Sequence, residues 1–187
     1  MQKAVFLDRD GSINKEVCYL HKLSEIEIME NVPQAIKKLK GMGYLTIVVS
    51  NQPVIAKGLA TEKEIKDINE KINELIKEQS GFGIDRFYFC PHHPDADLEK
   101  YRKICNCRKP SSGLLIKASE DFGIDLKKSW MIGDRISDIV AGNAVGCRTI
   151  LIETDYSNKK IAGVYNTPNE IPGFKVKKFY HCINIIK

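Results

Sequence analysis

The stretch of sequence that decides the fold reads Lys3-Ala4-Val5-Phe6-Leu7-Asp8-Arg9-Asp10-Gly11-Ser12. Its first half is a short apolar run, which predicts a buried β-strand at residues 3–7. Its second half places two carboxylates and a glycine directly after that strand. Polar residues at the end of a buried strand are typical of a ligand site in an open α/β sheet. We therefore expect Asp8 and Asp10 to lie at the carboxyl end of a strand within such a sheet.

Predicted strands and helices alternate along the rest of the chain. Buried strands are predicted at residues 44–50, 84–89, 130–132 and 148–152. Helices are predicted from about Pro33 to Gly41, from a capping box of Thr61 and Glu64 to Gly81, from about Ser112 to Gly123, and after Arg135 up to Val145. This alternation is typical of a parallel sheet with helices on both faces. We expect a Rossmann-like α/β fold, with residues 1–187 in a single domain.

The remaining segments carry weaker signals. Asn31 precedes the first predicted helix and is expected to cap it. Residues 157–160 are expected to form a surface loop, and residues 181–186 a terminal helix. Residues 90–113 are rich in Cys, His, Pro and charge, which predicts an irregular loop.

The composition favours a globular protein without a membrane or nucleic-acid partner. No apolar run approaches the roughly 20 residues that span a bilayer, and the N-terminal apolar run is too short for a signal peptide. A cytoplasmic location is therefore expected. The net charge is +5, but the lysines are spread over predicted helix faces, as at Lys37, Lys38 and Lys40. Such spreading favours a solvated surface over a nucleic-acid groove, and a mild positive field would attract a phosphorylated ligand.

Polar residues mark the ends of three predicted strands. Asp8 and Asp10 follow the first, Ser50 and Asn51 end the second, and Asp134 follows the fourth. The carboxyl ends of parallel strands meet at one end of a sheet. Three carboxylates brought together there would repel one another unless a cation held them. All-oxygen ligation favours Mg²⁺.

A magnesium site built from carboxylates suits the hydrolysis of a phosphate monoester. Asp8 would attack phosphorus, and Asp10 would protonate the leaving oxygen and later deprotonate water. Ser50 and Lys109 would bind the phosphoryl oxygens, where charge must be stabilised. The alternative is that Asp8 and Asp10 only cap a turn, which would leave Asp134 and the other strand ends unexplained.

Clustered cysteines and histidines predict a second metal site. Cys90 and His92 lie two residues apart, as do Cys105 and Cys107. Sulfur and imidazole ligands at such spacings suit tetrahedral zinc, and four protein ligands make the site structural. His93 is an alternative to His92. Zinc binding would order residues 90–109, a loop without an apolar core.

Four segments resemble, in order, the four motifs of the haloacid dehalogenase superfamily phosphatases. They are Asp8-Arg9-Asp10-Gly11-Ser12, Ser50-Asn51-Gln52, Arg108-Lys109-Pro110 and Gly133-Asp134-Arg135 with Asp138. The resemblance implies Asp8 as nucleophile and Asp10 as acid and base. It implies Mg²⁺ held by Asp8, the main-chain carbonyl of Asp10 and the side chain of Asp134. It implies that Ser50 and Lys109 bind the phosphoryl group. For Asp138 it allows two roles: support of the water molecules on the metal, or a capping or pairing contact within its helix.

The cysteine and histidine loop narrows this resemblance. Cys90-Pro91-His92-His93-Pro94 and Cys105-Asn106-Cys107-Arg108-Lys109-Pro110 resemble the zinc loop of the D-glycero-D-manno-heptose 1,7-bisphosphate 7-phosphatases. The related histidinol-phosphate phosphatases have a shorter gap between the two halves and remain the alternative. The resemblance implies zinc on Cys90, His92, Cys105 and Cys107, a minimal cap, a small phosphorylated sugar as substrate and a monomer. It implies substrate contacts from Glu16, Tyr19, Asn51, Gln52, Arg108 and Arg135, with Arg108 at the second phosphate.

Three departures from the family pattern lie near the expected substrate. Ser12 replaces a threonine and keeps the hydroxyl. Pro53-Val54 stand where Ser-Gly is usual, so this loop could follow a different path. Residues 16–19 keep Tyr19 but lack the usual Asp and Gly. We therefore expect the chemistry to be retained, with the sugar and its anomer undecided. Two further alternatives are a phosphatase acting on nucleic-acid ends and a zinc-stapled binding module without activity.

Overall fold

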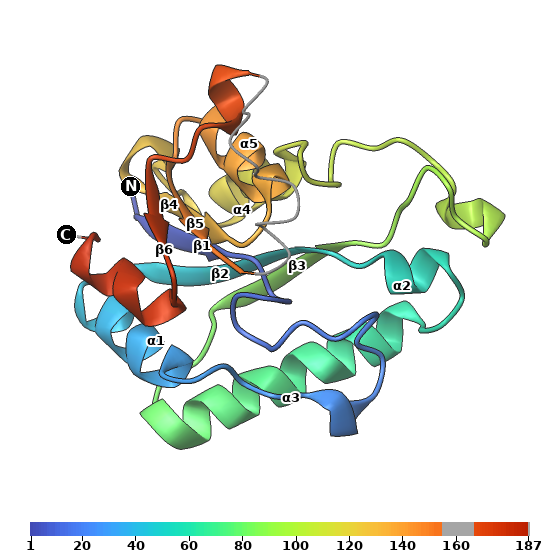
Figure 1. The fold of residues 1–187 in the computed structure, drawn as a ribbon, viewed down its shortest axis with the longest axis horizontal. Helices are drawn as coiled ribbons and strands as arrows, with labels where there is room; N and C mark the ends of the chain where they lie inside the picture. The colour runs from blue at the N-terminus through green and yellow to red at the C-terminus, as the bar shows by residue number, and fades with distance from the viewer. Residues whose placement is uncertain (155–166, 187) are drawn as a thin grey trace.

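A computed structural model describes residues 1–154 and 167–186 of the chain, and its centre is a six-stranded parallel sheet (Figure 1). The strand order is β3-β2-β1-β4-β5-β6. The strands are β1 (Ala4–Leu7), β2 (Leu45–Asn51), β3 (Arg86–Cys90), β4 (Trp130–Gly133), β5 (Arg148–Ile152) and β6 (Phe174–Val176). All neighbours pair in parallel. This order is that of a Rossmann-like α/β fold, which confirms the predicted class.

Helices cover both faces of the sheet. They are α1 (Val32–Gly41), α2 (Pro53–Ala56), α3 (Glu62–Ser80), α4 (Gly113–Phe122) and α5 (Ile136–Ala144). Helices α1 and α3 lie on one face, and α4 and α5 lie on the other (Figure 1). Because successive strand residues point to opposite faces, Leu7 packs in one core with Ile36, whereas Phe6 packs in the other with Leu115. Of the helices in the described ranges, none combines the length and apolarity that a bilayer crossing requires.

The strand order reverses between β1 and β4, and this reversal locates the site. The first strand pairs with β2 on one side and β4 on the other, and Asp8 N donates to Ile132 O at 2.9 Å. Asp8 and Asp134 directly follow these two central strands, as predicted. Ser50 and Asn51 are the last two residues of β2. Ligands bind at such switch points because the connections on either side diverge there and leave a crevice.

The helix boundaries agree with the sequence prediction at α3 and differ at α1. Thr61 and Glu64 form the predicted capping box, in which Glu64 N donates to Thr61 Oγ1 at 3.2 Å. Asn31 occupies the cap position of α1 but does not cap with its side chain. Its φ of 63° is left-handed, whereas a capping side chain reaches the first-turn amides from extended backbone. The prediction that Asn31 caps the helix is therefore wrong.

Several elements differ from the prediction near the chain ends and loops. The third strand begins at Arg86 instead of Ile84, and the sequence did not indicate the short helix α2 or strand β6. Residues 181–186 fall largely within a 3-10 turn, η5 (Phe179–Asn184), instead of an α-helix. Its buried residues include Phe179 and Cys182, three apart, which is the spacing of a 3-10 face. The loop predicted at residues 157–160 lies outside the described residues.

The segment between β1 and α1 bears on the predicted minimal cap. Residues 8–31 are all described, and they form a loop whose only helical element is the 3-10 turn η1 (Leu23–Glu25). The segment between β2 and β3 carries only α2 and α3. Neither of these two connections contains a cap domain, so the carboxyl ends of the strands stay accessible.

Substitutions at two helix glycines, Gly142 in α5 and Gly41 in α1, test how closely α5 packs on the sheet. A methyl group on Gly142 would lie 2.7 Å from Met131 Cβ and 2.8 Å from Thr149 Cγ2, whereas one on Gly41 would meet nothing within 4 Å. We expect Gly142→Ala to lower the free energy of unfolding by about 1–3 kcal/mol through overpacking. Gly41→Ala, the matched control, should raise it by up to about 1 kcal/mol. Urea denaturation of both variants checks this, and equal effects would contradict it.

Candidate active site

One cleft brings the predicted site residues together. It has a volume of about 760 Å³ and opens at the carboxyl ends of the central strands. Every residue predicted for catalysis, substrate binding or magnesium lines it: Asp8, Asp10, Glu16, Tyr19, Ser50, Asn51, Gln52, Arg108, Lys109, Asp134 and Arg135. Two further basic residues line it: Lys57, which lies outside the motifs, and His93, which the sequence named only as an alternative zinc ligand.

The Lys109 ammonium lies at the buried base of the cleft. Its Nζ is 2.8 Å from Asp8 Oδ1 and 2.6 Å from Asp138 Oδ1, and it donates to Val49 O at 2.7 Å. Lys109 is 3% exposed. Burial acts to lower the pKa of Lys109, but the carboxylates of Asp138 and Asp8 outweigh it and raise the pKa above the usual value. The ammonium therefore stays charged and offsets part of the carboxylate charge.

Asn51 holds the main chain of Lys109. Its Nδ2 donates to Lys109 O and its Oδ1 accepts from Lys109 N, both at 2.9 Å. The amide of Asn51 is thus engaged within the protein at both ends. Its predicted contact with substrate stays a prediction, and the structure adds a contact that the sequence did not indicate.

Three buried carboxylates surround a point beside Lys109. Asp8, Asp134 and Asp138 each offer an oxygen within 4.8 Å of the others. Burial raises the pKa of Asp8 to about 6, and the neighbouring Asp138 and Asp10 add to the shift while Lys109 opposes it. Burial, followed by the charges of Asp8 and Asp138, raises the pKa of Asp134 to about 8. A bound cation would relieve this repulsion and keep the group ionised.

Asp134 has an oxygen placed for such a cation. Its Oδ1 is buried and makes no hydrogen bond within the described residues. On its other side it packs against Gly11, where a Cβ would lie 2.4 Å from Asp134 Oδ2. An orphaned buried carboxylate oxygen among other carboxylates fits a hard cation such as Mg²⁺. Asp138 joins this cluster, and its Oδ2 also accepts from Arg135 N at 3.0 Å.

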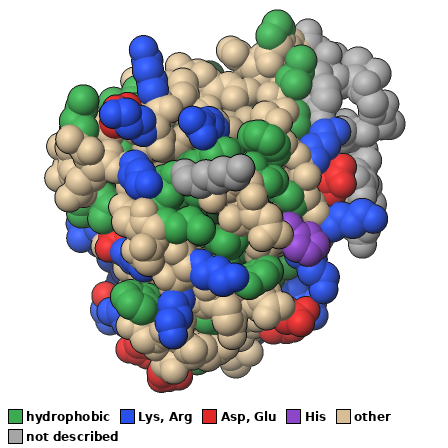
Figure 2. All heavy atoms as spheres, turned by 90° about the vertical axis from the view of Figure 1, so that its left-hand side faces the viewer, with side chains coloured by type: hydrophobic (Ala, Val, Ile, Leu, Met, Phe, Trp, Pro, Cys, Tyr) green, Lys and Arg blue, Asp and Glu red, His purple; other side chains and the backbone are tan. Residues whose placement is uncertain are grey.

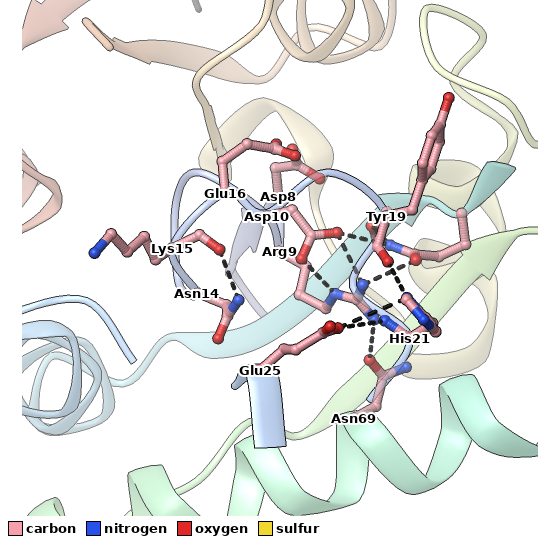
Figure 3. Close-up of polar contacts among 12 residues, drawn as sticks. Asp8, Arg9, Asp10, Asn14, Lys15, Glu16, Tyr19, His21, Glu25 and Asn69 are labelled. Carbon is pink, nitrogen blue, oxygen red and sulfur yellow. Dashed lines mark hydrogen bonds and ion pairs between the residues drawn. The ribbon is translucent and has the colours of Figure 1, made fainter. Parts of the chain in front are cut away.

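The carboxylate of Asp10 forms an ion pair with a different buried cation, the guanidinium of Arg9 (Figure 3). Arg9 is 1% exposed; its Nε donates to Asp10 Oδ1 at 3.0 Å and its Nη2 to Asp10 Oδ2 at 2.8 Å. The sequence motif contained Arg9 but did not assign it a role. An arginine flanked by two carboxylates directly after a buried strand was the signal for a buried ion pair.

Charged and aromatic side chains form the outer wall of the cleft. Arg135 Nη2 donates to Glu16 Oε2 at 3.0 Å, and Arg108 Nη1 donates to His92 O at 3.1 Å. Tyr19 has a φ of 61°, a left-handed conformation that is rare for a large side chain. Lys57 Nζ lies 5.4 Å from the centre of its ring. This wall is the part of the cleft that offers cations to a polyanionic ligand.

Pro53 and Val54, which differ from the family pattern, are the first two residues of the short helix α2. Pro53 lies in the first turn of α2, where its missing N–H has no helical partner to lose. Val54 is buried in the core beneath the cleft. The proline therefore suits the local backbone, and Gln52 becomes the cap residue of this helix.

The predicted zinc ligands form a compact cluster at the side of the cleft. The three sulfurs lie 3.0 Å (Cys90–Cys107), 3.1 Å (Cys105–Cys107) and 3.5 Å (Cys90–Cys105) apart. His92 Nδ1 lies 3.3 Å from Cys107 Sγ. Ligands at about 2.3 Å from a tetrahedral ion stand about 3.8 Å apart, so the cluster is slightly tighter than a filled site. His93 instead accepts from Asp95 N at 3.1 Å, so His92 is the histidine in the cluster.

Comparisons with known proteins agree with these motifs. A family model described as HAD-hydrolase-like matches residues 106–172. The chain is 38% identical to the D-glycero-beta-D-manno-heptose-1,7-bisphosphate 7-phosphatase of Haemophilus ducreyi over 154 residues, which cover 82% of this chain and 84% of that protein. It is also 38% identical to the Escherichia coli K12 protein of the same name, over 81% of this chain and 79% of that protein.

Solved structures share the fold over nearly the whole chain. The D,D-heptose 1,7-bisphosphate phosphatase of B. bronchiseptica, complexed with magnesium and phosphate, has a TM-score of 0.84 at 25% identity, covering 98% of this chain and 97% of that one. A putative HAD-like phosphatase from Mesorhizobium loti has a TM-score of 0.82 at 27% identity, covering 99% and 87%.

The shared ammonium gives a stability prediction. Lys109→Met removes the cation between Asp8 and Asp138 and leaves two buried carboxylates together, so we expect the free energy of unfolding to fall by about 3–5 kcal/mol. Lys128→Met, the control, breaks a pair between the exposed Lys128 and the partly buried Asp125 and should cost less than about 1 kcal/mol. Urea denaturation in magnesium-free buffer measures both. A Lys109 variant as stable as the control would show that the pair is not needed for folding.

Proposed function

Because this chain belongs to the family of the D-glycero-beta-D-manno-heptose-1,7-bisphosphate 7-phosphatases, within the HAD superfamily, we propose that it hydrolyses the C7 phosphate of that sugar bisphosphate. The observation that carries the proposal is the placement of Asp8. It lies beside Lys109, Asp134 and Asp138 at the base of an open cleft whose outer wall carries further cations. A nucleophile, a fixed positive charge and room for a second phosphate therefore occur in one place.

The reaction would proceed in two steps on Asp8. Asp8 attacks phosphorus, the bond to the sugar oxygen breaks, and Asp10 gives that oxygen a proton. Water then attacks the aspartyl-phosphate, Asp10 takes up its proton, and phosphate leaves with Asp8 restored. Ser50 and Lys109 hold the phosphoryl oxygens throughout. Magnesium, held by Asp8, Asp134 and the carbonyl of Asp10, would supply further positive charge at the phosphoryl group.

The outer wall would bind the part of the substrate that does not react. Arg108 and Arg135 offer guanidinium groups to the phosphate at C1, which must be bound but left intact. Glu16 and Tyr19 would contact the sugar. The β anomer is the proposed substrate because the curated relatives are named for it. Histidinol phosphate has one phosphate and would offer no second phosphate to Arg108 and Arg135.

Cys90, His92, Cys105 and Cys107 would hold a structural zinc ion. Cys107 precedes Lys109 by two residues. A zinc ion bound to Cys107 would therefore fix the main chain next to Lys109 and help to position its ammonium group. We further propose one domain over residues 1–187, a monomer, and a cytoplasmic site of action. On the face that Figure 2 shows, opposite the cleft, lysine and arginine side chains are scattered between hydrophobic ones and form no continuous basic stripe.

Phosphate release tests the proposed activity. We expect magnesium-dependent release from D-glycero-β-D-manno-heptose 1,7-bisphosphate, slower release from the α anomer, and little from histidinol phosphate. Asp8→Asn keeps the shape of the side chain but removes the nucleophile, so kcat should fall at least about a thousandfold. Preference for histidinol phosphate would overturn the substrate assignment. Binding of the heptose bisphosphate without any turnover would favour a binding module.

Metal analysis tests the zinc assignment. Cys107→Ser weakens a ligand at the centre of the cluster, so the variant should lose most of its zinc, and kcat should fall with the zinc content. Cys182→Ser changes a buried cysteine outside the cluster and should keep its zinc. Mass spectrometry of the metals in both variants decides the matter. Equal zinc contents would contradict the assignment.

A further inference from the structure

Arg9 controls the direction of a buried hydrogen-bond network. A guanidinium only donates hydrogen bonds. Its Nη2 donates to Gln52 Oε1 at 2.8 Å, and its Nη1 donates to Asn69 Oδ1 at 3.0 Å. Asn69 lies on α3, so this helix anchors the guanidinium from the side opposite Asp10 (Figure 3). The oxygen of the Gln52 amide must therefore face Arg9.

With its oxygen fixed, the Gln52 amide must present its NH₂ group to the site. Its Nε2 donates to Asp10 Oδ2 at 3.0 Å and to Ser50 Oγ at 2.6 Å. Gln52 is 2% exposed, so water does not compete for these bonds. Arg9 and Gln52 together give the Asp10 carboxylate three donated hydrogen bonds.

The direction of the bond to Ser50 has a chemical consequence. Because Ser50 Oγ accepts from Gln52, its own hydrogen points elsewhere, and Ser50 lines the cleft at the end of β2. A serine hydroxyl has a single hydrogen to donate. Had the Gln52 amide been reversed, its oxygen would have taken that hydrogen and would also have faced the carboxylate of Asp10.

We propose that Arg9 and Gln52 are positioning residues: Arg9 sets the direction of the Gln52 amide, and Gln52 thereby directs the Ser50 hydroxyl hydrogen toward the transferring phosphoryl group while holding Asp10. This inference rests on the proposed phosphatase function. It assigns Gln52 a role behind the residues that contact substrate, and it gives Arg9 a role in the reaction beyond its ion pair.

Two substitutions at Gln52 separate this role from packing. Gln52→Glu keeps the shape but offers only acceptors when it is ionised at pH 8. It would capture the Ser50 hydrogen, so we expect kcat to fall about 100-fold or more, with KM nearly unchanged. Gln52→Met alters the shape but leaves the hydroxyl free to turn, so kcat should fall about tenfold or less. A packing role predicts the reverse order, and that order would overturn the proposal.

Binding of orthovanadate with magnesium gives a readout that needs no turnover. Because the Ser50 donor acts on the phosphoryl oxygens, vanadate affinity should fall more in Gln52→Glu than in Gln52→Met. If the wild-type protein leaves the heptose bisphosphate intact but binds vanadate, the proposed substrate fails, and the order of these affinities still tests the network. If the substrate is hydrolysed but the order is reversed, the network fails alone.

A double-mutant cycle tests whether Arg9 acts through Gln52. Arg9→Met and Gln52→Met should each lower kcat, and the double variant should lose clearly less than the product of the two single losses, although Arg9 also contacts Asp10 directly. Losses that multiply would show that Arg9 acts by another route and would overturn its assigned role. Circular dichroism establishes that each variant is folded. If Arg9→Met does not fold, the order of the two Gln52 variants decides the proposal.

Discussion

The contact between the Lys109 ammonium and two buried carboxylates holds the site together. Asp8 follows β1, and Asp138 lies on α5, the helix after β4. Lys109 lies in the loop two residues after Cys107, the last of the predicted zinc ligands. One cation thus joins three separate parts of the chain. Its position depends on Asn51, which grips the main chain of Lys109 from the end of β2. A change in any of these segments would alter the surroundings of Asp8, the proposed nucleophile.

Charge is distributed within the cleft by giving each carboxylate a different partner. Asp8 forms an ion pair with Lys109, and Asp10 forms one with Arg9. Asp134 keeps a buried oxygen that receives no hydrogen bond from any described residue. One cation could not neutralise three buried carboxylates. Each carboxylate left without a cation raises the pKa of its neighbours, because like charges disfavour ionisation. The separation leaves Asp134 for the proposed metal and keeps the side chain of Asp10 outside the carboxylate cluster that the metal would occupy.

The motifs and their spacing predicted most of the fold and the members of the cleft. Apolar runs that end in polar residues were sufficient to place Asp8 and Asp134 at the same end of the sheet, because ligand sites in parallel sheets form at the carboxyl ends of strands. The contacts among the residues were not predictable. The pairing of Asn51 with Lys109 depends on side-chain direction. Asn69 lies on α3, for which the sequence indicated the two ends of the helix but no polar contact. The conformation of Asn31 was missed because sequence reports the residue type but not its φ.

The residues proposed for chemistry and those proposed for recognition lie on different kinds of backbone. Asp8, Ser50 and Asp134 lie at the ends of central strands, where neighbouring strands fix the main chain, whereas Glu16 and Tyr19 lie on the long irregular segment before α1. Loops accept substitutions and changes of length that strands do not. Descendants of such a protein can therefore acquire a preference for another phosphorylated compound by drift in this one segment, while the hydrolytic machinery is inherited intact.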